Sequence, residues 1–366
     1  MRFRDLILEL LPYGLYKGIK KRRNPNLFGE QYFQYINSKK KENGILFTNH
    51  KKTYSTVVSV EGLGYSGSGA ILDLLCEVDS CEVLGTDENA KTLGIDHKGK
   101  VELNLLRLSG GLFEIENFVA TNNIFQNDAV INRFISYLNS FSLFRDDFNV
   151  RWLCYDFFKS ITELSLENTS FNNHLLYTQS NPSIFFLKQM TVKEYRTLSS
   201  YFMTSLFNYL NNNNKEIIVT DQLLCDQDFN VSKYREYIPE CKNIVVYRDP
   251  RDVYAFAVQN NVTWIAHSDV NQFIKWFELM VKSFDINSTD YLVVQFEKLV
   301  TSYEEEILRV FDYLKIEKNQ HNVNKKKTFF DPSISIKNIG IWKSSDIPNS
   351  DFELIMNRYE QYCFNS

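Results

Sequence analysis

The sequence predicts an α/β fold with a mainly parallel central sheet and helices on both faces of that sheet. The domain also contains a helical insertion. Two short apolar strands, expected at Thr56–Val60 and Asn243–Tyr247, are each followed directly by a turn and a helix. Parallel strands require such helical crossovers, and strands covered on both faces appear as continuous apolar runs. Residues 110–213 contain long aromatic-rich stretches that indicate a largely helical insertion.

The elements follow one another in an order that suits this fold. The first strand leads into a helix over Ala70–Cys76, and a turn at Asp79 and Ser80 leads into a second strand, Cys81–Leu84. After the insertion, the Asn211–Asn214 run predicts a turn into a third strand, Glu216–Thr220. We expect residues 51–366 to form one domain with 110–213 as its helical insertion, and residues 1–50 to be an N-terminal segment and linker.

Length and composition exclude several classes of protein. The chain of 366 residues is long enough for a sizeable core, and its 44% hydrophobic and 23% charged residues are typical of a globular protein. Its 41 Lys and Arg against 45 Asp and Glu exclude a strongly basic nucleic-acid binder. Six cysteines without CxxC spacing and five scattered histidines give no metal signature, and they indicate reduced thiols in a cytoplasmic protein. No apolar run reaches the roughly 18 residues that span a bilayer.

The amino terminus has an amphipathic and basic pattern. Leu6, Ile7, Leu10 and Leu11 can share one face of a helix that Pro12 would end, and five Lys and Arg residues follow within 17–23. This pattern is typical of peripheral contact with an anionic membrane surface, here the cytoplasmic face. A docking helix followed by a solvated basic linker is the alternative.

A glycine-rich turn joins the first strand to its helix, within STVVSVEGLGYSGSGAILDLLC at 55–76. Backbone N–H groups in such a turn converge at a helix N-terminus, where the helix dipole favours a phosphate group. The spacing Gly62-x-Gly64-x-x-Gly67, with Asp87 twenty residues further on, fits a dinucleotide fingerprint. A Walker A loop would require Lys where Ser68 stands. A glycine turn that binds no ligand is a further alternative.

A second motif follows the strand Asn243–Tyr247, in KNIVVYRDPRDVYAFAVQN at 242–260. Pro250 suits the first turn of a helix and Asp249 suits its N-cap. Ligands of open parallel sheets bind outside the carboxyl ends of the strands. Arg248 and Arg251 at this edge, together with a glycine loop at another strand end, indicate a ligand with two separate phosphate groups. An Arg–Asp network that only ties the helix to its strand is the alternative.

Four motifs in this order resemble the sulfotransferase family that uses 3′-phosphoadenosine 5′-phosphosulfate (PAPS). The loop Ser66-Gly67-Ser68-Gly69 resembles its phosphosulfate loop, and the strand ending in RDPRDVY resembles its 3′-phosphate motif. YLVVQFEKLVTSYEEEILRVFDYL at 291–314 is similar to its strand, Glu-x-Leu turn and helix. KNIGIWK at 337–343 is similar to the segment that closes over the nucleotide. The resemblance covers most of residues 55–345 and implies a P-loop-like α/β domain.

The resemblance implies a role for each matching residue. The 5′-phosphosulfate would be held by the loop Tyr65, Ser66, Gly67, Ser68, Gly69 and Ala70. Arg248 and Arg251 would hold the 3′-phosphate, and Lys337, Gly340 and Lys343 would complete the clamp. The chain departs from the family at two positions, because Tyr65 replaces a basic residue and Phe256 replaces a Ser. Lys188 or Lys343 could supply the charge that Tyr65 lacks.

Transfer to a hydroxyl group requires a general base within reach of its proton. GTDENAKTLGIDH after the second strand offers Glu88, which we favour by position, and His97. Asp221, at the end of the third strand, is the next candidate, and Gln222 beside it could orient the acceptor. The other carboxylates considered are Asp87, Glu114 and Glu116.

The sequence therefore predicts a transferase, a sulfotransferase that moves the sulfuryl group of PAPS to a hydroxyl without a metal. By family analogy the acceptor is a carbohydrate or glycolipid of polysaccharide biosynthesis, and the insertion 110–213 would cover it. Two other functions remain open. The first is a P-loop kinase that uses ATP, although the absence of the Walker A lysine argues against it. The second is a non-catalytic protein that only binds the nucleotide.

Overall fold

The computed structural model describes residues 52–84, 108–121, 127–140, 143–144, 148–162, 187–224 and 234–364. The chain divides into two compact units, one comprising Ile115–Leu206 and the other Lys51–Glu114 and Phe207–Ser366. The central sheet and the predicted phosphate-binding motifs belong to the second unit, which we call the sheet unit. The amphipathic segment and linker expected at 1–50 lie outside the described residues.

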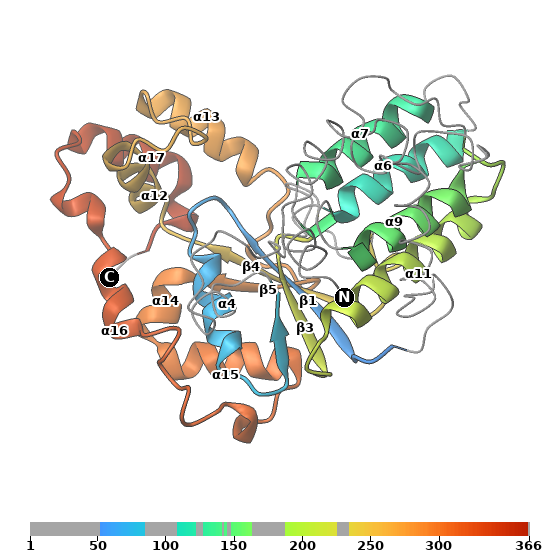
Figure 1. Cartoon of the computed structure of the whole chain (residues 1–366). Coiled ribbons are helices and arrows are strands. Elements are labelled where there is room, and N and C mark those ends of the chain that lie inside the picture. The colour runs from blue at the N-terminus through green and yellow to red at the C-terminus, as the bar shows by residue number, and fades with distance from the viewer. Residues whose placement is uncertain are drawn as a thin grey trace, which may run out of the picture. The chain divides into compact units, whose positions relative to one another are not determined.

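A five-stranded sheet forms the centre of the sheet unit, with the strand order β2-β3-β1-β4-β5 (Figure 1). All four pairs of neighbouring strands are parallel, which confirms the predicted α/β fold class. Each strand covers a predicted segment to within a few residues, because apolar runs bounded by turns fix strands locally. The bounds are Thr56–Gly62 (β1), Cys81–Val83 (β2), Ile217–Asp221 (β3), Cys241–Tyr247 (β4) and Leu292–Gln295 (β5).

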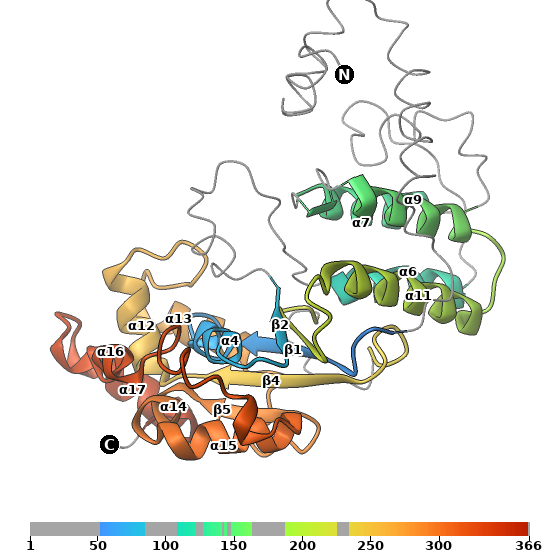
Figure 2. The same ribbon diagram turned by 60° about the horizontal axis from the view of Figure 1, so that its bottom comes forward.

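Helices cover both faces of this sheet (Figures 1 and 2). Side chains alternate along β4, so that Ile244 and Val246 face one layer and Val245 and Tyr247 face the other. The first layer contains α4 (Ser68–Cys76), α14 (Phe296–Thr301) and α15 (Tyr303–Leu314). The second contains α12 (Pro250–Gln259), α13 (Val270–Met280) and α17 (Asn349–Tyr359). Short helices complete this unit: η3 (Lys318–Gln320), α16 (Pro332–Ser335), η4 (Ile336–Asn338), η5 (Ile341–Ser344) and η6 (Glu360–Tyr362).

The expected insertion is helical in its described part. Its helices are α6 (Leu108–Thr121), α7 (Asn127–Ser140), α9 (Phe148–Ile161) and α11 (Val192–Leu210). Aromatic side chains fill its core, as the composition suggested, and the rings of Phe157 and Phe202 stack at 4.8 Å. Two nitrogens of the Arg196 guanidinium, Nη2 and Nε, donate to the carboxylate of Glu116 at 2.8 and 2.9 Å. Glu116 thus links α6 to α11, and this contact accounts for its charge.

Five of the six cysteines lie in the described part of the chain, where all five are buried and none forms a disulfide. Cys225 lies outside it. Among the described helices, none combines the length and apolar character needed to cross a membrane.

Candidate functional site

Four strands of the sheet end at one edge, and each is followed there by a polar or glycine-rich segment. Val60 of β1 pairs with Asp221, the last residue of β3, and Gly62 pairs with Val246 of β4. Tyr247, at the end of β4, pairs with Gln295 of β5. The parallel register therefore places the glycine loop, Asp221, the RDPRD segment and the start of α14 at the same edge, as the rule for open α/β sheets requires.

The glycine loop turns sharply into α4, where Ser68, Gly69 and Ala70 form the first turn. Gly67 caps this helix with a φ of 87°, a left-handed conformation that glycine adopts without strain. A Cβ atom on Gly67 would lie 2.4 Å from Cδ2 of Phe296, so no other residue fits. A Cβ on Gly62 would lie within 2.9 Å of the hydroxyls of both Ser66 and Ser68, which shows that these hydroxyls converge over the loop.

Ser66 contributes a buried donor that has no hydrogen-bond partner in the described part of the chain. The residue is only 2% exposed, and no described group hydrogen-bonds to its Oγ atom. A buried hydroxyl without a partner costs free energy, so such an atom is expected to bind a ligand. In the first turn of α4 the N–H of Ala70 donates to the carbonyl of Gly67 at 2.9 Å, whereas the helix offers no intrahelical acceptor to the N–H groups of Ser68 and Gly69. The loop therefore has the donors that a phosphate or sulfate group needs.

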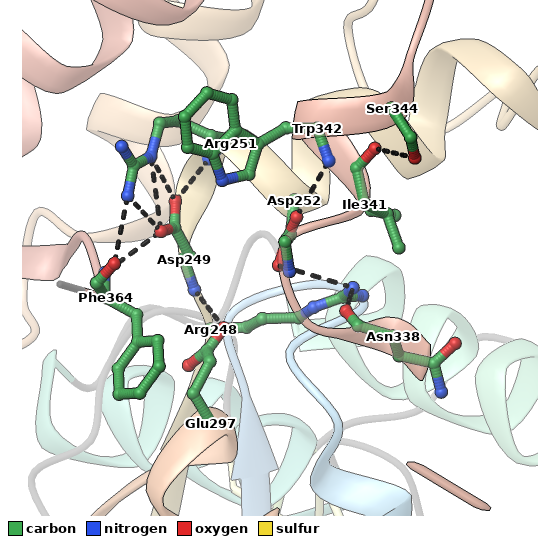
Figure 3. A network of polar contacts seen from close by, with 11 residues as sticks. Arg248, Asp249, Arg251, Asp252, Glu297, Asn338, Ile341, Trp342, Ser344 and Phe364 are labelled. Atoms are coloured by element: carbon green, nitrogen blue, oxygen red, sulfur yellow. Dashed lines mark hydrogen bonds and ion pairs between the residues drawn. The ribbon is translucent and has the colours of Figure 1, made fainter. Parts of the chain in front are cut away.

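Arg248 provides a second unsatisfied donor. It is 6% exposed, and its Nη2 atom donates to the carbonyl of Asn338 and lies 3.9 Å from Oδ2 of Asp252 (Figure 3). Its Nε atom has no hydrogen-bond partner. Burial lowers the pKa of the guanidinium, and the carboxylates of Asp252, Glu297 and Asp249 oppose this shift. Arg248 remains a cation with one donor unused.

One aromatic ring lies beside both the glycine loop and Arg248. The ring of Phe296 fills the space beside Gly67, and its centre lies 5.5 Å from the guanidinium carbon of Arg248. The glycine loop, which follows β1, and Arg248, which follows β4, thus both lie against the ring of Phe296. This arrangement fits the expected ligand, which carries two phosphate-type groups joined through one nucleoside.

The segment around GIWK is fastened directly to the RDPRD segment. The carboxylate of Asp252 accepts hydrogen bonds from the N–H groups of Gly340 at 2.8 Å and Trp342 at 3.1 Å (Figure 3). Lys337 and Lys343 are exposed, and Nζ of Lys343 lies 5.7 Å from the centre of the Trp342 ring. The structure therefore brings the predicted clamp beside Arg248, with the two lysines reaching solvent.

Arg251 has a different environment from Arg248. Its Nη2 atom lies 2.6 Å from Oδ2 of Asp249 and donates to the carbonyl of Phe364 at 3.1 Å (Figure 3). Its guanidinium carbon lies 4.4 Å from the centre of the Trp342 ring. These contacts tie the C-terminal segment to α12, so the Arg–Asp network that the sequence left as an alternative exists at this residue.

Glu297 was not among the candidate residues, although it follows β5 as Arg248 follows β4. It is fully buried, and its Oε1 accepts a hydrogen bond of 2.9 Å from the N–H of Asp249, whereas Oε2 has no partner. Burial raises the pKa of Glu297 to about 7, and the N–H of Asp249 opposes the shift. The available sequence signal was the Glu-x-Leu turn at 297–299, which follows β5.

Of the three base candidates Glu88, Asp221 and His97, Asp221 is the one that lies within the described residues. Its side chain is exposed at the end of β3, but the protein around it still removes part of the water from the carboxylate, and this desolvation raises its pKa to about 6. The next residue, Gln222, has a φ of 45°, so the chain turns sharply at this point. Glu88, His97 and Asp87 lie outside the described residues.

The two departures from the family pattern contact each other. The ring of Tyr65 lies 4.8 Å from that of Phe256, and neither carries a charge. Lys188, one of the two proposed substitutes for the missing charge, donates to the carbonyls of Lys159 and Ser160 at 2.9 and 3.1 Å. An aromatic pair thus stands where the family has a basic residue and a hydroxyl.

No protein-family model matches this chain, and neither does any curated protein. Among solved structures, the chain is similar to the sulfotransferase domain of the Synechococcus PCC 7002 olefin synthase, with TM-score 0.38 and 11% identity over 88% of this chain and 98% of that one. It is also similar to sulfotransferase STF9 from Mycobacterium avium, with TM-score 0.38 and 8% identity over 89% and 80%. A third is retinol dehydratase in complex with androsterone and the inactive cofactor PAP, with TM-score 0.34 and 12% identity over 86% and 81%.

Two of these three proteins are named as sulfotransferases, the family that the four sequence motifs resemble. All three TM-scores lie below 0.5, so the function proposed below rests on the contacts of this chain.

Proposed function

We propose that this protein is a sulfotransferase that moves the sulfuryl group of PAPS to a hydroxyl group. The observation that carries the proposal is a pair of buried donors, Ser66 Oγ and Arg248 Nε, that follow β1 and β4 and have no partner among the described residues. The ring of Phe296 lies beside Gly67, the neighbour of Ser66, and beside the guanidinium of Arg248. Ser66 and the first turn of α4 would hold the 5′-phosphosulfate, and Arg248 would hold the 3′-phosphate. A charge-assisted contact between arginine and phosphate is among the stronger hydrogen-bonded pairs.

PAPS supplies the sulfuryl group, which leaves its phosphate oxygen as a new bond forms to the acceptor oxygen. The chain's own tasks are to position the two partners, to stabilise negative charge and to accept the hydroxyl proton, as in phosphoryl transfer. Asp221 suits the last task, because a base works best with a pKa near the operating pH and that of Asp221 is about 6. Glu88, which the sequence favoured by position, is the other candidate base.

The acceptor is proposed to be a carbohydrate or glycolipid of polysaccharide biosynthesis, sulfated in the cytoplasm or at the cytoplasmic face of a membrane. The basic amphipathic start of the sequence supports the membrane part of this proposal. The likeness in sequence to carbohydrate-type sulfotransferases supports the acceptor class.

Nucleotide binding by the full-length protein tests the proposal first. Thermal denaturation should be measured with 3′-phosphoadenosine 5′-phosphate (PAP), AMP and ATP. A ligand that binds only the folded state adds roughly 2.7 kcal/mol of stability at a hundredfold excess over Kd. PAP should stabilise the protein more than AMP or ATP does, because only PAP offers phosphate to both donors. Stabilisation by ATP alone would favour the kinase, and equal effects of PAP and AMP would refute a 3′-phosphate site.

Transfer of labelled sulfate from PAPS to a set of glycans and glycolipids tests the reaction itself. Binding of PAP without transfer to any of these acceptors would favour a protein that only binds the nucleotide.

A further inference from the structure

Three aromatic rings from separate segments pack together at the glycine loop, and we call them the aromatic platform: Phe256, Tyr65 and Trp264. The ring centre of Tyr65 lies 4.8 Å from that of Phe256 of α12, with the planes tilted by 41°, and 5.1 Å from that of Trp264, with the planes only 16° apart. Trp276 of α13 contacts Trp264 edge-on, at 6.1 Å. The platform ends in Trp264, which packs on Tyr65 with one face.

The outer part of the platform is open to solvent. Trp264 is 53% exposed and Tyr65 is 42% exposed, although both are large and mainly apolar. By contrast, Phe273 of α13 is buried, and Trp276, which contacts both Phe273 and Trp264, is half-buried. Grouped exposed aromatic side chains next to a binding site usually serve a ligand, because exposure without one forgoes the free energy of burial.

The platform is fixed against the backbone of the glycine loop. Gly64 has a φ of 70°, and a Cβ atom there would lie 2.9 Å from the Trp276 ring and 3.1 Å from the Trp264 ring. Tyr65 is the next residue, directly before the buried donor Ser66. A ligand ring on the platform would therefore lie at a defined distance from any group that the loop holds. Such fixed placement of a second reactant is what transfer chemistry requires.

The surroundings of Trp264 favour a neutral ligand with many hydroxyl groups. The segment QNNVTWIAHS at 259–268 contains no Lys, Arg, Asp or Glu. It exposes amide and hydroxyl side chains instead: Gln259, Asn260, Asn261, Thr263 and Ser268. An anionic ligand would be held better by basic groups, which this segment lacks. The exposed carboxylate of Asp269, the next residue, already accepts hydrogen bonds from the N–H groups of Asn271 and Gln272 as the cap of α13. The C–H face of a pyranose ring can pack on an electron-rich aromatic face, while its hydroxyls reach amide groups at the rim.

We propose that the aromatic platform is the acceptor subsite of this protein and that it binds the neutral pyranose ring of a carbohydrate. The proposal rests on the proposed sulfuryl transfer and narrows its acceptor class. It also explains both departures from the family pattern together, because Tyr65 and Phe256 are the inner two rings of one binding surface.

Saturation-transfer difference NMR on the full-length protein tests this subsite without relying on activity. The probes are the methyl pyranosides of glucose, galactose, mannose and N-acetylglucosamine, each measured with and without saturating PAP. At least one should receive saturation, most strongly at the protons of one ring face. Trp264→Ala should weaken its binding by roughly fivefold or more, the contribution expected of one aromatic face. Trp264→Phe should restore part of it.

The control is Leu308→Ala, which removes a side chain of α15 that is 41% exposed and remote in sequence from the platform. It should leave glycoside binding unchanged, and Trp264→Ala should leave PAP affinity unchanged. If the wild-type protein binds PAP but none of the four glycosides, the subsite is refuted and the proposed sulfuryl transfer survives. A loss of PAP affinity in Trp264→Ala would assign the platform to the adenine base and also refute it. Failure of PAP itself to bind would refute the proposed function.

Discussion

Phe296 occupies the position that any side chain at residue 67 would need, with its Cδ2 atom 2.4 Å from the site of a Cβ on Gly67. The same ring lies against the guanidinium of Arg248. Phe296, the first residue of α14, therefore limits the shape of the glycine loop and also packs beside the arginine. The two proposed phosphate sites are built around one side chain that belongs to neither motif.

Gly67→Ala should lower the free energy of unfolding by about 1–3 kcal/mol, because a residue with a side chain at a φ of 87° is strained and would overlap Phe296. Urea denaturation measures the change. Gly69→Ala is the matched control, since a Cβ at Gly69 meets no atom within 4 Å. That substitution in the first turn of α4 should keep or raise stability. Equal effects of the two substitutions would contradict the role given to the Phe296 contact.

Arg248→Ala should remove the preference for PAP over AMP. The guanidinium is the one buried cation at the end of β4 with an unused donor among the described residues, so its loss should affect only the nucleotide that carries a 3′-phosphate. Isothermal titration calorimetry with both nucleotides gives the ratio of affinities. Arg358→Ala on α17, an exposed pair with Glu278, serves as the control.

Circular dichroism will show whether Arg248→Ala folds, because Arg248 also holds the carbonyl of Asn338. Should it not fold, Arg248→Lys provides a second variant that keeps the charge and loses the forked donors. A folded variant that still prefers PAP would show that Arg248 does not bind the 3′-phosphate.

Glu297 should make the protein less stable as the pH rises. Its pKa is about 7 in the folded protein and near 4.5 in an unfolded chain, so the folded state binds the proton more tightly. The resulting stabilisation is complete below about pH 4.5 and is lost as the pH rises through 7. Between pH 5 and pH 8 the loss from this one group should be roughly 2–3 kcal/mol.

Glu297→Gln keeps an oxygen for the N–H of Asp249 and removes the ionisable group. Urea denaturation at pH 5 and pH 8 should therefore show a smaller pH effect in Glu297→Gln than in the wild-type protein. The same pH dependence in both proteins would mean that Glu297 does not titrate in this range.

Asp221→Asn should lower turnover by a factor of about 10²–10⁴ with little change in PAP affinity, if Asp221 accepts the proton of the acceptor. A base must be ionised, so the rate of the wild-type enzyme should rise with pH and level off above the pKa of about 6. Asp221→Asn should lack this rise. Steady-state rates at several pH values with labelled PAPS provide the measurement.

Glu88→Gln is the parallel variant, because the position of Glu88 after the second strand made it the first choice from the sequence. A comparable loss of turnover in Glu88→Gln, with full activity in Asp221→Asn, would assign the base to Glu88. His97→Ala tests the third candidate in the same way. Full activity of all three variants would place the base at another residue.

The sequence alone predicted the strands of the sheet and singled out the two motifs that we propose to bind phosphate groups. β1 and β4, the Asp249 cap and Pro250 at the start of α12 appear where the pattern predicted them, because apolar runs, glycine and proline act on their nearest neighbours. The parallel sheet followed from the helical crossovers. Arg248 could be placed at the carboxyl edge for the same reason.

Only the tertiary structure decided how these motifs meet. Arg251 binds Asp249 and packs on the ring of Trp342, whereas Arg248 keeps one donor without a partner among the described residues. This difference between the two arginines depends on tertiary packing, which the local sequence pattern does not contain. The contact of Tyr65 with Phe256 and the position of Phe296 beside Gly67 likewise join residues that are distant in the chain. Strand register and the packing of helices on the sheet bring such residues together, and both depend on the whole core rather than on neighbouring residues.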